Sequence, residues 1–232
     1  MLIGGLQKTT LLDYPGLVAC TVFTLGCNFK CPFCHNSGLV YNNEGLGVDK
    51  TLILNFLSKR KGILDGVCIT GGEPLLYDEL EYFIQDIKTM GFKVKLDTNG
   101  SLPDKLEKLI KTGYLDYIAM DIKTCLDSRY DQITGARINL ADIRKSIKLI
   151  QKSGIDHEFR TTVVKPFHKT EDLVEIAKML GKSEKYFLQN FVDSGHCINA
   201  EGLSSFSEDE LNDALKQVQK YVPHAAIRGQ EN

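Results

Sequence analysis

The sequence predicts an α/β fold in which parallel strands are covered by outer helices. Six short runs rich in β-branched and aromatic residues alternate along the chain with six longer amphipathic segments. Strands that alternate with helices pair in parallel through right-handed crossovers. This pattern alone leaves open whether the sheet closes into a barrel.

Each expected strand is a short apolar run bounded by turn residues. The strands are expected at residues 17–24, 66–70, 92–97, 117–123, 157–164 and 186–191. Between and after them come segments with helical periodicity. The helices are expected at residues 49–61, 78–90, 103–112, 140–153, 170–180 and 207–221.

Several of these helices carry start and stop signals. Pro103 stands at a first turn, and Ser207 precedes an acidic stretch, as is typical of helix starts. A glycine follows four of the helical patterns, where a left-handed cap residue is expected. These glycines are Gly91, Gly113, Gly154 and Gly181.

The bulk properties are those of a soluble globular chain. Of the 232 residues, 43% are hydrophobic and 25% are charged, and the formal net charge is −2, so no basic surface for nucleic acid is expected. No apolar stretch is as long as a transmembrane helix, and the first ten residues do not resemble a signal peptide. We therefore expect a cytoplasmic protein that binds neither nucleic acid nor membrane. A single domain over residues 1–232 is expected, with a core at about 17–191 and a C-terminal helix at about 207–221.

Seven cysteines in such a chain are more typical of ligands or core residues than of disulfides. Three of them fall within eight residues on a loop after the first strand, where their thiolates can converge on one inorganic centre. These are Cys27, Cys31 and Cys34. The other four stand singly, two in apolar strands and two in polar surroundings: Cys20, Cys68, Cys125 and Cys197.

Three cysteines are one fewer than an iron–sulfur cluster normally takes. One iron would then lack a protein ligand, and an open position is where a catalytic metal site binds its substrate. The alternative is a zinc site. Zinc would require a fourth ligand, and His35 is awkwardly placed for this role because it directly follows Cys34.

Polar residues end the later strands. In the strand at 117–123, Asp121 and Lys123 share one face, and the opposite face is apolar. Asp97 and Asn99 alternate with apolar neighbours in the same way, Glu158 and Arg160 share a face, and Gln189 and Asn190 close the last strand. Each residue could simply end a strand near water. Together they fit the catalytic rim of a barrel better.

The motif Cys-x3-Cys-x2-Cys, with Phe33 before its last cysteine, resembles the signature of the radical-SAM superfamily. The resemblance implies a partial (β/α)6 barrel and one [4Fe-4S] cluster, held by Cys27, Cys31 and Cys34, whose open iron binds S-adenosyl-L-methionine. It also implies that Gly71, Gly72 and Glu73 form the motif that receives the methionine amino group. Phe33 and His35 would contact the adenine.

The pattern is most similar to the activating enzymes of glycyl-radical proteins, in detail to anaerobic ribonucleoside-triphosphate reductase activating proteins. The matching segments are residues 10–16, 34–36, 97–100 and 121–123. By this analogy Asn99, Asp121, Lys123 and Arg160 should bind S-adenosyl-L-methionine. Two carboxylates aimed into one rim, those of Asp97 and Asp121, would repel each other unless a positive charge lay between them, so we expect a shared monovalent cation, and the analogy supports it. A direct salt bridge to a Lys or Arg is the alternative.

The resemblance also implies the reaction and its partners. A flavodoxin- or ferredoxin-type donor would reduce the cluster, the cofactor would be split to methionine and a 5′-deoxyadenosyl radical, and that radical would take a hydrogen atom from a glycine of a partner enzyme. The expected partner of this anaerobic oxidoreductase is anaerobic ribonucleotide reductase. No catalytic residue beyond the cluster and the cofactor is expected.

Other functions remain open at this point. The chain could be a pyruvate formate-lyase-type activase, or a radical-SAM enzyme acting on a small metabolite or a nucleotide. It could also be an iron–sulfur electron carrier without catalysis. That last reading leaves Glu73, Asp121 and Lys123 without a role.

Overall fold

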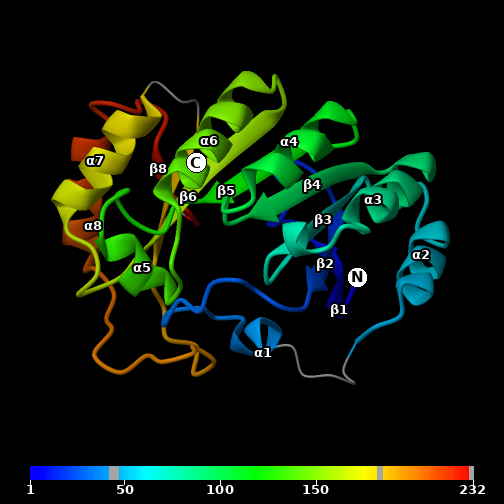
Figure 1. The fold of residues 1–232 in the computed structure, drawn as a ribbon, viewed down its shortest axis with the longest axis horizontal. Coiled ribbons are helices and arrows are strands. Elements are labelled where there is room, and N and C mark those ends of the chain that lie inside the picture. Colours follow the sequence, from blue (N-terminus) through cyan, green and yellow to red (C-terminus); the bar gives the residue numbers. More distant parts are fainter. Residues whose placement is uncertain (42–46, 182–184, 230–232) are drawn as a thin grey trace.

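The computed structural model describes residues 1–41, 47–181 and 185–229. Eight strands form one sheet in the order of the sequence, and each strand from β2 to β7 runs parallel to the next. In the described part of the chain β1 and β8 do not pair, so the sheet curves into an open barrel (Figure 1). The strands are β1 (Ile3–Thr10), β2 (Ala19–Thr24), β3 (Gly66–Gly71), β4 (Lys93–Thr98), β5 (Tyr117–Asp121), β6 (Asp156–Val163), β7 (Tyr186–Asn190) and β8 (Ala226–Ile227).

The six parallel strands confirm the prediction, with ends that differ by no more than two residues. The two outer strands were not expected. β1 runs antiparallel to β2, and its polar stretch at 7–9 hides the apolar pattern that marks a strand. β8 is too short to produce a periodic signal, and it adds to the edge of β7. Both strands pair with the edge of a neighbouring strand, a contact that local sequence patterns do not reveal.

All six expected helices are present, on the outside of the sheet (Figure 1). Two further short helices and a 3-10 turn, η1, lie in the loops, and they are too short for periodicity to reveal. The four glycines expected after helices all have positive φ. The helices are α1 (Ser37–Val40), α2 (Lys50–Ser58), α3 (Leu80–Thr89), α4 (Pro103–Lys111), α5 (Arg129–Thr134), α6 (Leu140–Lys152), α7 (Thr170–Leu180) and α8 (Glu208–Val218), and η1 is Pro74–Leu76.

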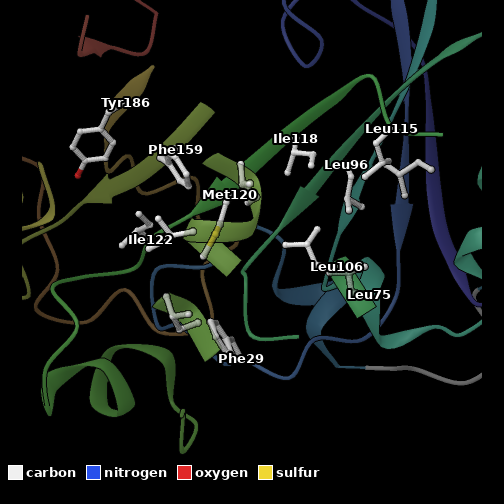
Figure 2. Packing of buried hydrophobic residues seen from close by; sticks show 14 of the residues in the cluster. Phe29, Leu75, Leu96, Leu106, Leu115, Ile118, Met120, Ile122, Phe159 and Tyr186 are labelled. Atoms are coloured by element: carbon white, nitrogen blue, oxygen red, sulfur yellow. The ribbon is translucent and has the colours of Figure 1, made fainter. Parts of the chain in front are cut away.

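The main core lies between the sheet and its outer helices. The side chains of Ile118 and Met120 on the outer face of β5, and of Ile122 just after it, lie next to Leu96 of β4 and Phe159 of β6 (Figure 2). The other face of β5 points into the barrel. Since successive side chains of a strand point to opposite faces, burying Ile118 and Met120 against helices turns Tyr117, Ala119 and Asp121 towards the interior.

Candidate active site

A cavity of about 260 Å³ lies at the carboxyl ends of the parallel strands. Its wall combines the loop after β2 with the ends of β3 to β7. Of the site residues expected from the sequence, all but Glu73 line it. They are Cys27, Cys31, Phe33, Cys34, His35, Gly71, Gly72, Asp97, Asn99, Asp121, Lys123 and Arg160. The structure thus brings together residues from five strand ends, at the rim where α/β barrels carry their chemistry.

The loop that carries the three cysteines, residues 25–36, is held from two sides. The backbone N–H of Glu73 donates a hydrogen bond to the carbonyl oxygen of Gly26 at 2.9 Å. On the other side, the N–H of Lys30 donates to the carbonyl oxygen of Thr134 at the end of α5, at 2.7 Å. The position of the thiols therefore depends on segments distant in sequence.

The three thiols have the donor chemistry of an iron–sulfur cluster. Burial raises the pKa of Cys27 to about 12 and that of Cys31 to about 11, and the positive charge of Lys123 opposes both increases. Within the described residues, no three His, Cys, Asp or Glu side chains converge as the ligands of one metal ion would. A cluster takes one thiolate per iron, so its ligands surround a larger volume. The three cysteines and the cavity beside them fit such a cluster.

The two glycines at the end of β3 are required by close packing. A Cβ at Gly72 would lie 1.8 Å from the carbonyl oxygen of Gly26, and a Cβ at Gly71 would lie 2.4 Å from the backbone nitrogen of Thr24. Gly71 also has a φ of +114°, which residues with a side chain rarely adopt. Glycine here lets the end of β3 pack directly against the cysteine loop.

The carboxylate of Glu73 is fully buried and does not line the cavity. Its Oε1 accepts hydrogen bonds from the hydroxyl of Thr98 at 2.8 Å and the N–H of Leu75 at 3.1 Å, and its Oε2 accepts one from the N–H of Asn99 at 2.7 Å. Burial raises its pKa to about 7 in spite of these bonds. The amide of Asn99 in turn donates to Asn28 in the cysteine loop at 2.9 Å. In this structure Glu73 joins the ends of β3 and β4, and its expected contact with the cofactor remains a prediction.

Arg160 lies between the two rim aspartates. Its Nε donates to Asp121 at 2.8 Å, and its terminal nitrogens donate to Asp97 at 3.1 Å. Each aspartate also pairs with a lysine. Lys95 lies 2.5 Å from Asp97, and Lys123 lies 3.0 Å from Asp121. Burial would raise the pKa of each aspartate, but the charge of Arg160, and then of the neighbouring lysine, holds it below its usual range. Of the two arrangements left open by the sequence, the direct salt bridge is the one seen here. A shared monovalent cation stays a prediction.

Two residues that follow the second cysteine, Phe33 and His35, each pack against an aromatic ring from a distant part of the chain. Phe33 packs on Phe167 with 6.2 Å between ring centroids. The imidazole of His35 stacks on Phe191 at 5.8 Å, and its Nδ1 lies 3.3 Å from the hydroxyl of Ser194. The segment after β7 therefore covers the end of the cysteine motif.

The cavity also has lining residues to which the sequence assigned no role of their own. Phe29, Asn36 and Val40 belong to the cysteine loop and α1, while Thr70, Thr98 and Thr162 lie at strand ends. Threonine is common in strands and gives no chemical signal of its own. Strand-end position, the criterion that identified Asp97 and Asp121, is the signal that could have found the three threonines.

Fold and site together define the class of structure, an open (β/α)6 barrel with a cysteine-lined cavity at the carboxyl ends of its parallel strands. Residues 21–180 match the radical SAM superfamily. The chain belongs to this superfamily. Members contain a [4Fe-4S] cluster and use S-adenosyl-L-methionine, which agrees with the three thiols found in the cavity. None of the described helices is long and apolar enough to cross a membrane.

Two curated relatives give different indications of function. The chain is 32% identical to the "Putative glycyl-radical enzyme activating enzyme MJ1227" of Methanocaldococcus jannaschii, over 98% of this chain and 95% of that protein. It is also 27% identical to a "Probable GTP 3',8-cyclase" of Saccharolobus islandicus, over 88% of this chain. The matched region spans 64% of that protein's length.

Solved structures of low sequence identity share the fold. Streptococcus suis SuiB bound to S-adenosylmethionine superposes with a TM-score of 0.71 at 18% identity, over 89% of this chain and about half (49%) of the SuiB chain. A domain of pyruvate-formate lyase-activating enzyme from Bacteroides vulgatus superposes with a TM-score of 0.55 at 18% identity, over 71% of this chain and 99% of that domain. These likenesses support the open barrel.

Proposed function

We propose that this chain is a glycyl-radical enzyme activating enzyme, with Cys27, Cys31 and Cys34 as the ligands of its cluster. The observation that carries the proposal is the cavity that three thiols share with a charged strand-end rim. The near full-length similarity to the Methanocaldococcus jannaschii protein supports the activase class. When bound, the cluster and S-adenosyl-L-methionine supply one-electron cleavage of the sulfonium and removal of a hydrogen atom from the substrate.

The residues of the rim bind and orient the cofactor in this proposal. Lys123 and Arg160 are positive groups at the cavity wall, and they are suited to the carboxylate of the methionine moiety. Asp121 and Asn99, which line the cavity, offer acceptors for its ammonium and ribose hydroxyl groups. The carboxylate of Glu73, buried behind the cavity wall in this structure, is the proposed partner of the ammonium group. In this proposal the backbone around Phe33 and His35 holds the adenine, and the contacts of their rings with Phe167 and Phe191 support this segment.

We propose a protein as the substrate, with anaerobic ribonucleotide reductase as the partner and a flavodoxin or ferredoxin as the electron donor. A glycine in a folded partner can react only if its loop enters the cavity. In this proposal the loop enters from the open side of the barrel, between β1 and β8, which do not pair in the described part of the chain. The partner's glycine loop would have to leave its own core to reach this route.

The test is the formation of a radical on the partner. The protein, with its cluster reconstituted anaerobically, is mixed with the reductase, S-adenosyl-L-methionine and dithionite, and the doublet signal of a glycyl radical is sought by electron paramagnetic resonance. Cys31→Ala in this chain, or Gly→Ala at the partner's radical site, should abolish the signal. If 5′-deoxyadenosine forms but neither this reductase nor pyruvate formate-lyase gains a signal, the activase proposal fails.

The second candidate is a radical reaction on a nucleotide. It is favoured by the similarity to proteins described as GTP 3',8-cyclases. The same reconstituted enzyme is incubated with GTP in place of the protein partner. GTP-dependent consumption of S-adenosyl-L-methionine, with a new nucleotide product, would replace the activase assignment.

A further inference from the structure

Below the cavity floor, a second layer of buried charge lies beside Arg160. Glu158 precedes Arg160 by two residues on β6, so both side chains point into the barrel. The side chain of Glu158 is 1% exposed. Its Oε1 lies 3.7 Å from Arg160, and its Oε2 accepts a hydrogen bond from the hydroxyl of Tyr117 at 3.0 Å. An anion buried this deeply needs a closely bound cation.

Arg228, just after β8, supplies that cation. Its Nη2 donates to Oε1 of Glu158 at 2.6 Å, a much closer contact than that of Arg160. Two other contacts fix Arg228: its N–H donates to the carbonyl oxygen of Leu188 at 2.9 Å, and its guanidinium stacks on the ring of Phe187 at 3.9 Å. The pairing of the short strand β8 with β7 thus positions the guanidinium of Arg228 beside Glu158.

We propose that Arg228 is a positioning residue for the active site, which neutralises Glu158 and thereby leaves Arg160 free to hold Asp97 and Asp121 at the cavity. Glu158 and the two aspartates compete for Arg160. Without Arg228, a normal hydrogen bond to Glu158 would require Arg160 to move by about 1 Å towards it. That movement would lengthen its contacts at 2.8 and 3.1 Å with the rim aspartates. A shift of this size at a reacting site is costly.

The inference rests on the proposed role of Arg160 in cofactor binding, so its test has two independent readings. The first uses the cluster-free protein. Arg160 is one of six arginines in the chain, so its Nε–H resonance can be assigned by comparison with Arg160→Lys. Arg228→Gln should shift this resonance, whereas Arg144→Gln, a change of a surface arginine, should not.

The second reading is the affinity of the reconstituted protein for S-adenosyl-L-methionine. Arg228→Gln should raise the dissociation constant roughly three- to tenfold, with the iron content unchanged. Arg228→Lys should keep most of the affinity. The double variant Arg228→Gln with Glu158→Gln removes both charges, and it should restore the resonance position and the affinity.

The outcomes separate the two claims. If the Arg160 resonance does not move in Arg228→Gln, or if Glu158→Gln does not restore it, the positioning role is wrong and Arg228 serves only to attach β8. If the resonance moves as expected but Arg160→Gln binds S-adenosyl-L-methionine normally, the positioning role stands and the proposed cofactor contact of Arg160 is wrong.

Discussion

The carboxylate of Glu73 accepts a hydrogen bond from the backbone N–H of Asn99 at 2.7 Å. This bond joins the ends of β3 and β4 directly beside the cavity. With the hydroxyl of Thr98 and the N–H of Leu75, three donors depend on this one buried group. The acidic residue of the glycine-rich motif therefore has a structural role in the cluster-free protein. That role can be measured separately from any contact with the cofactor.

We expect Glu73→Ala to lower the free energy of unfolding of the cluster-free protein by about 3 kcal/mol, because three buried donors lose their acceptor. Glu107→Ala, which removes an exposed partner of Lys111, is the matched control and should cost little. Urea denaturation measures both. Equal, small effects of the two variants would show that Glu73 does not hold the strand ends together.

Glu73→Gln tests the contact with the cofactor. This variant keeps the shape and an acceptor oxygen but removes the negative charge. If the carboxylate binds the ammonium group of S-adenosyl-L-methionine, the dissociation constant should rise about tenfold, as loss of a charge-assisted hydrogen bond implies. Normal affinity in an equally well folded Glu73→Gln protein would assign Glu73 to structure alone.

Reconstitution should give about four irons per chain, as expected for one cubane cluster. Replacing Cys27, Cys31 or Cys34 with Ala should abolish the cluster, and iron analysis with visible absorption measures this. The matched controls are the same change at Cys20, Cys68, Cys125 and Cys197, and these proteins should keep their iron. About eight irons, or stoichiometric zinc, would contradict a single [4Fe-4S] centre.

Gly72→Ala should prevent the cysteine loop from packing against β3. The added Cβ would lie 1.8 Å from a backbone oxygen that cannot move alone, so we expect roughly 2 kcal/mol of destabilisation and poor retention of the cluster. Gly38→Ala is the control, since a Cβ there meets nothing within 4 Å. Thermal unfolding and iron content compare the two. A Gly72→Ala protein that retains iron as well as Gly38→Ala does would mean that the close approach is not needed.

His168 should make stability depend on pH. Burial lowers its pKa below the ordinary 6.5, while its Nε2 lies 2.8 Å from the carbonyl oxygen of Lys123. Since the unfolded chain binds this proton more readily, the contribution of His168 to stability is present above pH 6.5 and is lost as the pH falls through the lowered pKa. His168→Gln should therefore flatten the decline in stability below pH 6.5. The same slope in both proteins would exclude His168 as its source.

Much of the fold could be predicted because its signals are local. Six apolar runs and the glycines after the helices marked the parallel strands and helix ends, since strand propensity and capping act over a few residues. β1 was missed because its second half, which includes Gln7 to Thr9, is polar. Its place in the sheet comes from the edge of β2, which local pattern does not reveal.

The residue types of the site were also visible in the sequence. The spacing of Cys27, Cys31 and Cys34 on one loop, and the polar ends of successive strands, are properties of short segments, and parallel pairing brings such ends to one edge. The partners of those groups were not visible. The alternation of side chains along a strand indicates which face Asp97 or Arg160 occupies, but it does not indicate which ion pair each residue forms.

The sequence by itself thus determined the class of fold, the cysteine loop and the rim, because the pattern that predicts each of them lies within a short segment of the chain. Only the tertiary structure decided that Glu73 is enclosed between two strand ends, that Arg160 separates two aspartates, and that Arg228 reaches Glu158 across 70 residues. The reason is physical. A buried charge takes whichever opposite charge the strand register and chain packing bring within hydrogen-bonding distance, and that depends on the whole sheet.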